Sequence, residues 1–278
     1  MARPSQSSVA RGARRLAGAC CAALLLAACQ TTPGGTDAVP PELDGYLENP
    51  AVFSEMAGGN VVASAAYWGG LYERDPRNAE AAAEYASALR KIGSFAAALD
   101  VLRRADALNP NHPRLLAEYG KTLTAAGRAA EALPILDQAL AADPGNWKTQ
   151  SARGVALDQM GQHEAARAAY RTAAAAAPGE PAPWNNLGMS YALTGDLAEA
   201  EEALREAVAT PRATARMRQN LALILGLKGD FTEAERLSRA DLPPEAVDGN
   251  LQTLREIVSQ PALWSNEAHA DNNPVIIE

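Results

Sequence analysis

The tripeptide Gly120-Lys121-Thr122 has residue types that could bind a phosphate group. In a phosphate-binding loop, glycine backbone N–H groups and a lysine surround the phosphates, and the pattern is Gly-x-x-x-x-Gly-Lys-Ser/Thr. That pattern requires a further glycine five residues before Gly120, but Leu115 occupies the position. We therefore expect the chain to bind no nucleotide and no other cofactor.

The three histidines are the other candidates for chemistry, and they are scattered at His112, His163 and His269. A metal ion or a general base needs partner side chains that converge on it, and the spacing supplies none. We therefore expect a protein that is not an enzyme. A hydrolase site carried on a larger scaffold is the alternative, and it would require a serine or aspartate paired with a histidine in a cleft.

Cys29 is the residue with the clearest predicted covalent chemistry. Four arginines and an apolar run over 16–28 precede it, which is typical of a secretory signal peptide and too short to span a bilayer. The run ends in Leu26-Ala27-Ala28-Cys29, which resembles a bacterial lipobox, where a peptidase cuts before a cysteine that receives lipid. Ordinary signal-peptidase cleavage beside an incidental cysteine is the alternative.

The lipobox assigns residues 1–28 to the signal peptide and leaves Cys29 as the only cysteine of the mature chain. Lipid on Cys29 would anchor the protein, because two acyl chains already give stable membrane binding. Gln30 replaces the aspartate that often retains lipoproteins at the inner membrane in enteric bacteria, so we expect the periplasmic face of a Gram-negative outer membrane. Residues 29–44, rich in Pro, Gly and Thr, predict a flexible tether, and 261–278 predict a disordered tail.

The charge balance narrows the range of partners. The formal net charge is −8, and it falls to near −12 in the mature chain because the charged residues of 1–28 are all arginines. So acidic a protein is poorly suited to bind nucleic acid or anionic lipid surfaces. Alanine is abundant and aromatic residues are few, which favours closely spaced helices.

Glycines recur every 34 residues along most of the chain. They stand at Gly59, Gly93, Gly127, Gly161, Gly195 and Gly229. Seven positions before the last five glycines the residue is always small, namely Ala86, Gly120, Gly154, Gly188 and Ala222. A fixed period of this length indicates stacked helical units that share one continuous core.

Each unit is predicted to contain two helices. In the unit that begins at Pro181, Gly195 ends the first helix in the left-handed conformation, and Asp196 caps the second with Glu199 as its capping-box partner. Gly188 and Ala200 should lie where the two helices meet. Close approach of the backbones would offset the roughly 1 kcal/mol that glycine costs inside a helix.

The repeat resembles the tetratricopeptide repeat. The best match is carried by Trp184, Leu187, Gly188, Tyr191, Gly195, Ala200 and Ala207. The resemblance implies an all-α, right-handed solenoid of antiparallel helix pairs over 45–244, closed by a C-terminal helix over 245–260. Its units are a degenerate one at 45–78 and full ones near 79–112, 113–146, 147–180, 181–214 and 215–244. Three residues depart from the pattern: Pro134 within a second helix, Arg153 at an apolar position, and Asp241 where other units have alanine.

In tetratricopeptide solenoids the first helices line a concave groove. The predicted groove residues of this chain are Arg90, Lys91, Lys121, Val155, Asn186, Met189, Leu193, Asn220, Leu223 and Leu227. Asn186 and Asn220 are 34 residues apart, and their amides could clamp the backbone of an extended peptide. Asparagine could also simply be common there, and the apolar residues could form either a floor for a partner helix or shared core.

Residues 219–257 resemble the end of the TadD family, the tetratricopeptide lipoproteins of the tight-adherence machinery that assembles Flp pili. Arg239, Asp241, Leu242 and Pro243, followed by the closing helix, carry most of this resemblance. It implies an outer-membrane scaffold for pilus assembly or secretion, with pilus-assembly or secretin proteins as partners. Another periplasmic repeat lipoprotein, such as a pilotin or a regulator of cell-wall synthesis, is the alternative.

Overall fold

A computed structural model describes residues 60–259, and every regular element in that range is a helix. The expected all-α fold is therefore confirmed. Cys29, the segments 1–28 and 29–44, the first part of the degenerate unit with Gly59, and the tail 261–278 lie outside the described residues.

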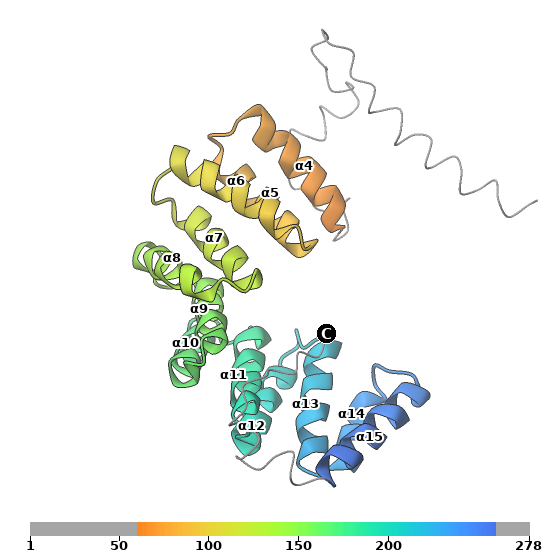
Figure 1. Cartoon of the computed structure of the whole chain (residues 1–278). Helices are drawn as coiled ribbons and strands as arrows, with labels where there is room; N and C mark the ends of the chain where they lie inside the picture. The colour runs from red at the N-terminus through yellow and green to blue at the C-terminus, as the bar shows by residue number, and fades with distance from the viewer. Residues whose placement is uncertain (1–59, 260–278) are drawn as a thin grey trace, which may run out of the picture. The chain divides into compact units, whose positions relative to one another are not determined.

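The helices alternate between two layers (Figure 1). The first helices of the pairs, which we call A helices, are α5 (Ala79–Lys91), α7 (Pro113–Ala125), α9 (Trp147–Gln159), α11 (Pro181–Leu193) and α13 (Ala215–Leu227). The second, called B helices, are α6 (Phe95–Leu108), α8 (Ala129–Ala142), α10 (His163–Ala176), α12 (Leu197–Ala209) and α14 (Phe231–Ser238). Helix α4 (Val61–Arg74) precedes the first pair, and α15 (Pro244–Val258) follows the last.

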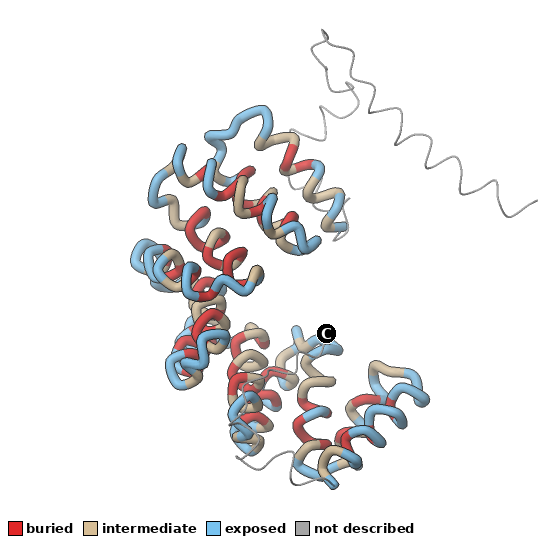
Figure 2. Tube along the Cα trace, viewed as in Figure 1, coloured by how far each residue is buried: buried red, intermediate tan, exposed pale blue. Residues whose placement is uncertain are grey.

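The small residues lie where the two helices of a pair come closest. A Cβ atom built on Gly188 would lie 2.6 Å from Leu204 Cγ and 3.0 Å from the backbone oxygen of Ala200. Gly154 meets Tyr170 in the same way one unit earlier. These positions have no room for a side chain, as predicted, and Figure 2 shows buried residues along the facing sides of the helices.

The turn between the two helices of a pair uses a left-handed glycine. Gly195 has φ +79°, and the N–H of Asp196 then donates to the carbonyl of Tyr191. The predicted cap at Asp196 is wrong, because its carboxylate accepts hydrogen bonds from Arg167 and Thr194 instead of from the start of α12. Asp230 does cap its helix, since its Oδ1 accepts from the N–H of Glu233 at 3.1 Å.

Neighbouring pairs share their core. Leu157 of α9, Tyr170 of α10, Leu187 of α11 and Ala203 of α12 belong to one cluster of buried side chains. Consecutive A helices also contact one another directly from α5 through α13. The A helices therefore form a continuous layer, and the solenoid expectation is confirmed.

Helix α15 covers the end of the last pair. Its Leu254 Cδ1 would lie 2.5 Å from a Cβ atom on Gly226 of α13, and Val247 and Leu251 are buried beside it. None of the helices within residues 60–259 is long and apolar enough to cross a membrane.

The three departures from the repeat are accommodated by the fold. Asp241 accepts two hydrogen bonds from Arg218 of α13, at 2.5 and 2.8 Å, and so ties the turn before α15 to that helix. Arg153 of α9 donates to Asp137 Oδ1 of α8 at 2.6 Å, half-buried between the two units. Helix α8 continues through Pro134, whose side chain is exposed.

Candidate partner-binding surface

The 34-residue period aligns equivalent side chains along the layer of A helices. One such row contains Ser87, Lys121, Val155, Met189 and Leu223, from five successive A helices. The row changes from polar and basic at α5 and α7 to apolar at α9, α11 and α13. We call the side of the A helices that carries this row the A-helix surface.

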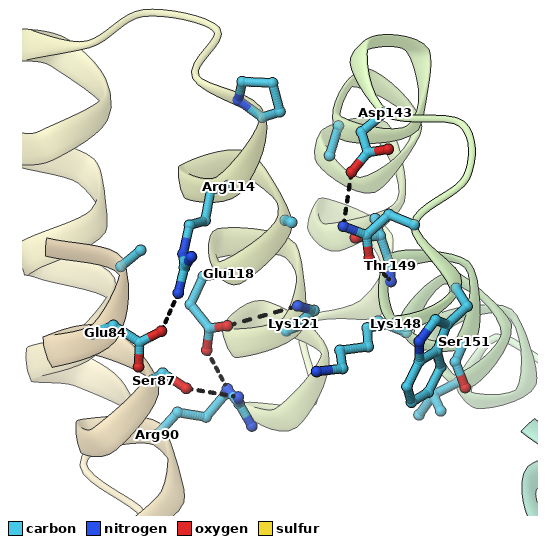
Figure 3. Close-up of a pocket in the computed structure, with 18 of the residues that line it drawn as sticks. Glu84, Ser87, Arg90, Arg114, Glu118, Lys121, Asp143, Lys148, Thr149 and Ser151 are labelled. Carbon is cyan, nitrogen blue, oxygen red and sulfur yellow. Dashed lines mark hydrogen bonds and ion pairs between the residues drawn. The ribbon is translucent and has the colours of Figure 1, made fainter. Parts of the chain in front are cut away.

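A cavity of about 870 Å³ opens on the A-helix surface between α5, α7 and α9 (Figure 3). The predicted residues Arg90, Lys91, Lys121, Val155 and Asn186 all line it. Asn186 belongs to α11, so the cavity reaches across four successive A helices.

Five cationic side chains and three carboxylates line this space, which we call the basic cavity. The cations are Arg90, Lys91, Arg114, Lys121 and Lys148, and the carboxylates are Glu84, Glu118 and Asp143. The cavity therefore carries a formal excess of positive charge within an acidic protein. Such a surface attracts anionic groups.

Glu118 is the centre of the ion pairs in the cavity. It accepts a hydrogen bond from Arg90 Nε at 2.7 Å, and Lys121 Nζ lies 3.8 Å from its other oxygen. Burial lowers the pKa of Lys121, and Glu118 opposes this shift while Arg90, Lys148 and Arg114 add to it. Arg114 pairs with two glutamates of α5. These are Glu84 and Glu80, and the distance to Glu80 is 2.9 Å.

The sequence prediction missed two cations of the basic cavity, Arg114 and Lys148. They are 34 residues apart and occupy the second position of α7 and α9, so the repeat register contained the signal. Both are exposed, and the Lys148 ammonium lies 5.5 Å from the ring centroid of Trp147. The second residue of each A helix thus contributes to the cavity lining at α7 and α9.

A row of polar side chains continues from the basic cavity toward α13. Asn220 donates to Asn185 Oδ1 at 2.8 Å, Asn185 to Asn186 Oδ1 at 3.4 Å, and Asn186 to Ser151 Oγ at 3.0 Å. The two predicted clamp residues are thus joined through Asn185 into one amide ladder. A peptide that binds there must replace some of these side-chain hydrogen bonds with its own backbone groups.

The apolar part of the surface is divided between exposed and half-buried residues. Leu193 is 60% exposed and Leu223 is 40% exposed, so neither belongs to the core shared by neighbouring units. Leu227, by contrast, is half-buried against the cluster that includes Leu225 and Leu251. Met189 is also half-buried. Leu193 and Leu223 are therefore the two exposed leucines among the predicted groove residues of α11 and α13.

The tripeptide with candidate phosphate-binding chemistry lies within a helix. Gly120, Lys121 and Thr122 lie inside α7, and a Cβ atom on Gly120 would lie 2.4 Å from Leu136 Cγ. The hydroxyl of Thr122 is buried and donates to the carbonyl of Glu118 at 2.8 Å. This segment is a helix interior and lacks the loop that would surround a phosphate.

One serine, aspartate and histidine do come together, at Ser190, Asp158 and His163. The serine hydroxyl donates to Asp158 Oδ1 at 2.8 Å, and His163 Nδ1 lies 2.9 Å from the same oxygen. Nucleophilic catalysis would need the serine hydrogen-bonded to the base and open to substrate. Ser190 is fully buried and contacts the carboxylate, so this group joins α9, α10 and α11.

The metal-ligating residue types do not cluster in the described part of the chain. Within residues 60–259, no group of three or more His, Cys, Asp or Glu side chains is arranged to hold a metal ion.

Family profiles match the repeats directly. Three tetratricopeptide-repeat profiles match residues 79–122, 123–188 and 185–212. The protein contains tetratricopeptide repeats. The helices α5, α7, α9 and α11 lie within the matched residues.

Solved structures share the fold at low sequence identity. PilW, described as a widely conserved type IV pilus biogenesis factor, is 20% identical over 78% of this chain and 99% of its own, with a TM-score of 0.63. A thermophilic tetratricopeptide protein of Thermus thermophilus is 22% identical over 66% of this chain and 99% of its own, with a TM-score of 0.54. A MamA structure from Desulfovibrio magneticus, covering residue 41 to the end, is 23% identical over 59% of this chain and 97% of its own, with a TM-score of 0.49. No curated protein matches the chain.

Proposed function

We propose that this protein is a non-enzymatic scaffold that binds a segment of a partner protein on its A-helix surface. One observation carries the proposal. The basic cavity, the amide ladder and the exposed leucines of α11 and α13 adjoin along five successive A helices. A surface of this length, with polar groups for a backbone and apolar positions for side chains, suits an elongated protein segment.

The assembly that we propose is a pilus, with pilus-assembly or secretin proteins as partners. Two observations support it. The end of the repeat domain resembles the TadD family of the tight-adherence system, which would make the product a Flp pilus. PilW, which shares the fold over most of this chain, is itself described as a type IV pilus biogenesis factor. That similarity also favours the second candidate, a pilotin-like role in a type IV pilus.

We further propose that lipid on Cys29 holds the scaffold at the periplasmic face of the outer membrane. The lipobox sequence and Gln30 support this proposal. The proline- and glycine-rich residues 29–44 would then separate the repeats from the bilayer. A scaffold held in this way would meet its partners at the membrane through which a pilus leaves the cell.

Replacing both clamp residues tests the partner-binding proposal. We expect Asn186→Ala with Asn220→Ala to reduce capture of partners by tagged protein, since both amides that could bond a peptide backbone are lost. A loss of about tenfold in affinity corresponds to about 1.4 kcal/mol, or one to two hydrogen bonds. Capture from solubilised native membranes, quantified by mass spectrometry, gives the result.

Asn250→Ala is the matched control, because Asn250 is exposed on α15, which is not one of the A helices. Helicity measured by circular dichroism should stay the same in both variants. Unchanged partner capture by the double variant would leave the amide ladder with no role in binding.

A further inference from the structure

Lysine is scarce in this chain, and it is concentrated at one place. The sequence has four lysines, and three of them, Lys91, Lys121 and Lys148, line the basic cavity. The fourth, Lys228, lies outside the cavity and pairs with Glu201 at 2.6 Å. In a protein with a net negative charge, this distribution points to a specific use for the cations of the cavity.

Two of the cavity's cations have no carboxylate partner within residues 60–259. Arg90 and Lys121 share Glu118, and Arg114 is paired with glutamates of α5. Lys91 and Lys148 form no ion pair with another residue of that range. Figure 3 shows the Lys148 side chain pointing across the cavity toward Lys121 and Arg90. Their charges are thus available to a ligand.

The dimensions of the cavity favour a chain segment over a small ion. Its lining includes residues of α5, α7 and α9 and Asn186 of α11, so it spans three spacings between successive A helices. At about 8–10 Å per spacing this is about 24–30 Å. An extended segment rises about 3.3 Å per residue, so about eight residues would fill that length.

We propose that the basic cavity binds an acidic segment of the partner protein, with its carboxylates paired to Lys91 and Lys148. The proposal rests on the proposed function, because it names the chemistry of the segment bound on the A-helix surface. Residues of the partner that follow the acidic segment would cross the amide ladder and reach Leu193 and Leu223. The ligand would therefore be acidic in one part and apolar in the next.

Lys121 strengthens the case for carboxylates. It is largely buried between Glu118 and other cations, and its pKa is lowered chiefly by that burial. A bound carboxylate beside Lys121 would replace part of the lost hydration and favour the charged ammonium. The cavity thus has two exposed cations, Lys91 and Lys148, that attract an acidic segment. It also has a largely buried one, Lys121, whose charged form a bound carboxylate would stabilise.

The test uses the mature full-length chain and three fluorescein-labelled octapeptides. One alternates glutamate with alanine, and the others replace every glutamate by glutamine or by lysine. We expect the glutamate peptide alone to bind in an anisotropy titration, with an affinity that falls as salt increases. Lys91→Gln with Lys148→Gln should weaken its binding by about tenfold, as expected for the loss of two exposed ion pairs.

Arg103→Gln with Lys228→Gln is the matched control, since it removes the same charge outside the cavity. It should change the affinity by less than about twofold. Equal binding of the glutamate and glutamine peptides, or equal loss in both double variants, would overturn the proposal. Tighter binding of inorganic phosphate than of the glutamate peptide, measured by competition, would also overturn it.

A failure of this test is distinguishable from a failure of the proposed function. If partners are captured from native membranes in a manner that depends on Asn186 and Asn220, but the glutamate peptide does not bind, only the acidic nature of the segment is wrong. If neither is observed, the binding role of the whole A-helix surface is wrong.

Discussion

The contact at Gly188 shows what a single residue decides in this protein. Its missing side chain allows Leu204 and the backbone of Ala200 to approach α11. The sequence alone indicated this contact, because small residues recur at that position in every unit. The sequence did not indicate that the Asp196 carboxylate would bond Arg167 instead of capping α12. An aspartate just before a helix is compatible with either role.

Gly188→Ala should destabilise the fold by about 1–3 kcal/mol, because the added methyl group overpacks a contact that includes immobile backbone. Gly249→Ala, on the outer side of α15, is the matched control, since an added Cβ meets nothing within 4 Å. It should stabilise by about 0.5–1 kcal/mol through helix propensity. Urea denaturation compares the two, and equal effects would contradict the close-approach explanation.

At the scale of elements, the repeat period predicted the helices well and their side-chain partners poorly. The register of glycines and small residues specifies where a pair of helices turns and touches. Ion pairs such as Arg153 with Asp137 join residues whose separation has no fixed period, so the sequence offered no rule for them. Asp241 is another example, because its departure from alanine made sense only once Arg218 was found beside it.

Asp241 should make the attachment of α15 sensitive to acid. Hydrogen bonds from Arg218 hold the pKa of Asp241 below its ordinary value. The stability that this pair contributes is therefore fully present above about pH 4, the unfolded pKa of aspartate, and is lost as the pH falls through the lower folded value.

The comparison of Asp241→Asn with the native chain tests this at two pH values. We expect the variant to have the lower urea midpoint at pH 7, with the difference shrinking at about pH 3, where the native carboxylate begins to take up a proton. Asp248→Asn, on the exposed face of α15, is the control. A difference that grows on acidification would show that the pair does not act in this way.

At the scale of the whole molecule, the sequence predicted the solenoid, and half of the predicted groove residues line one cavity. The repeat register and the tetratricopeptide resemblance together placed Arg90, Lys91, Lys121, Val155 and Asn186 in one groove, and all five line one cavity. Arg114 and Lys148 lie at the second position of α7 and α9, outside the middle and end of the A helices, where the predicted groove residues lie. Arg90 and Arg114 pair with glutamates of neighbouring units, Glu118 and Glu84. Such pairs depend on three-dimensional packing, so the sequence could not show which cations remain unpaired.

The proposed membrane anchor concerns the whole molecule, and Cys29 lies outside the described residues. Cys29→Ala should move the protein from the membrane pellet to the soluble periplasmic fraction, since no lipid would be attached. Cys21→Ala is the control, because that residue is expected to leave with the signal peptide. Continued sedimentation of the Cys29 variant with outer membranes would contradict lipid anchoring.

The most direct measurement of the central claim is photo-crosslinking from the A-helix surface in living cells. A photoreactive residue at Leu223, which is 40% exposed, is compared with one at Leu108 of α6, which is 42% exposed on a B helix. A third at Val155 samples the same row of A-helix residues as Leu223. We predict that positions 155 and 223 crosslink the same partner protein and that position 108 does not. Crosslinks to that partner from position 108 alone would show that the A-helix surface is not where this protein binds.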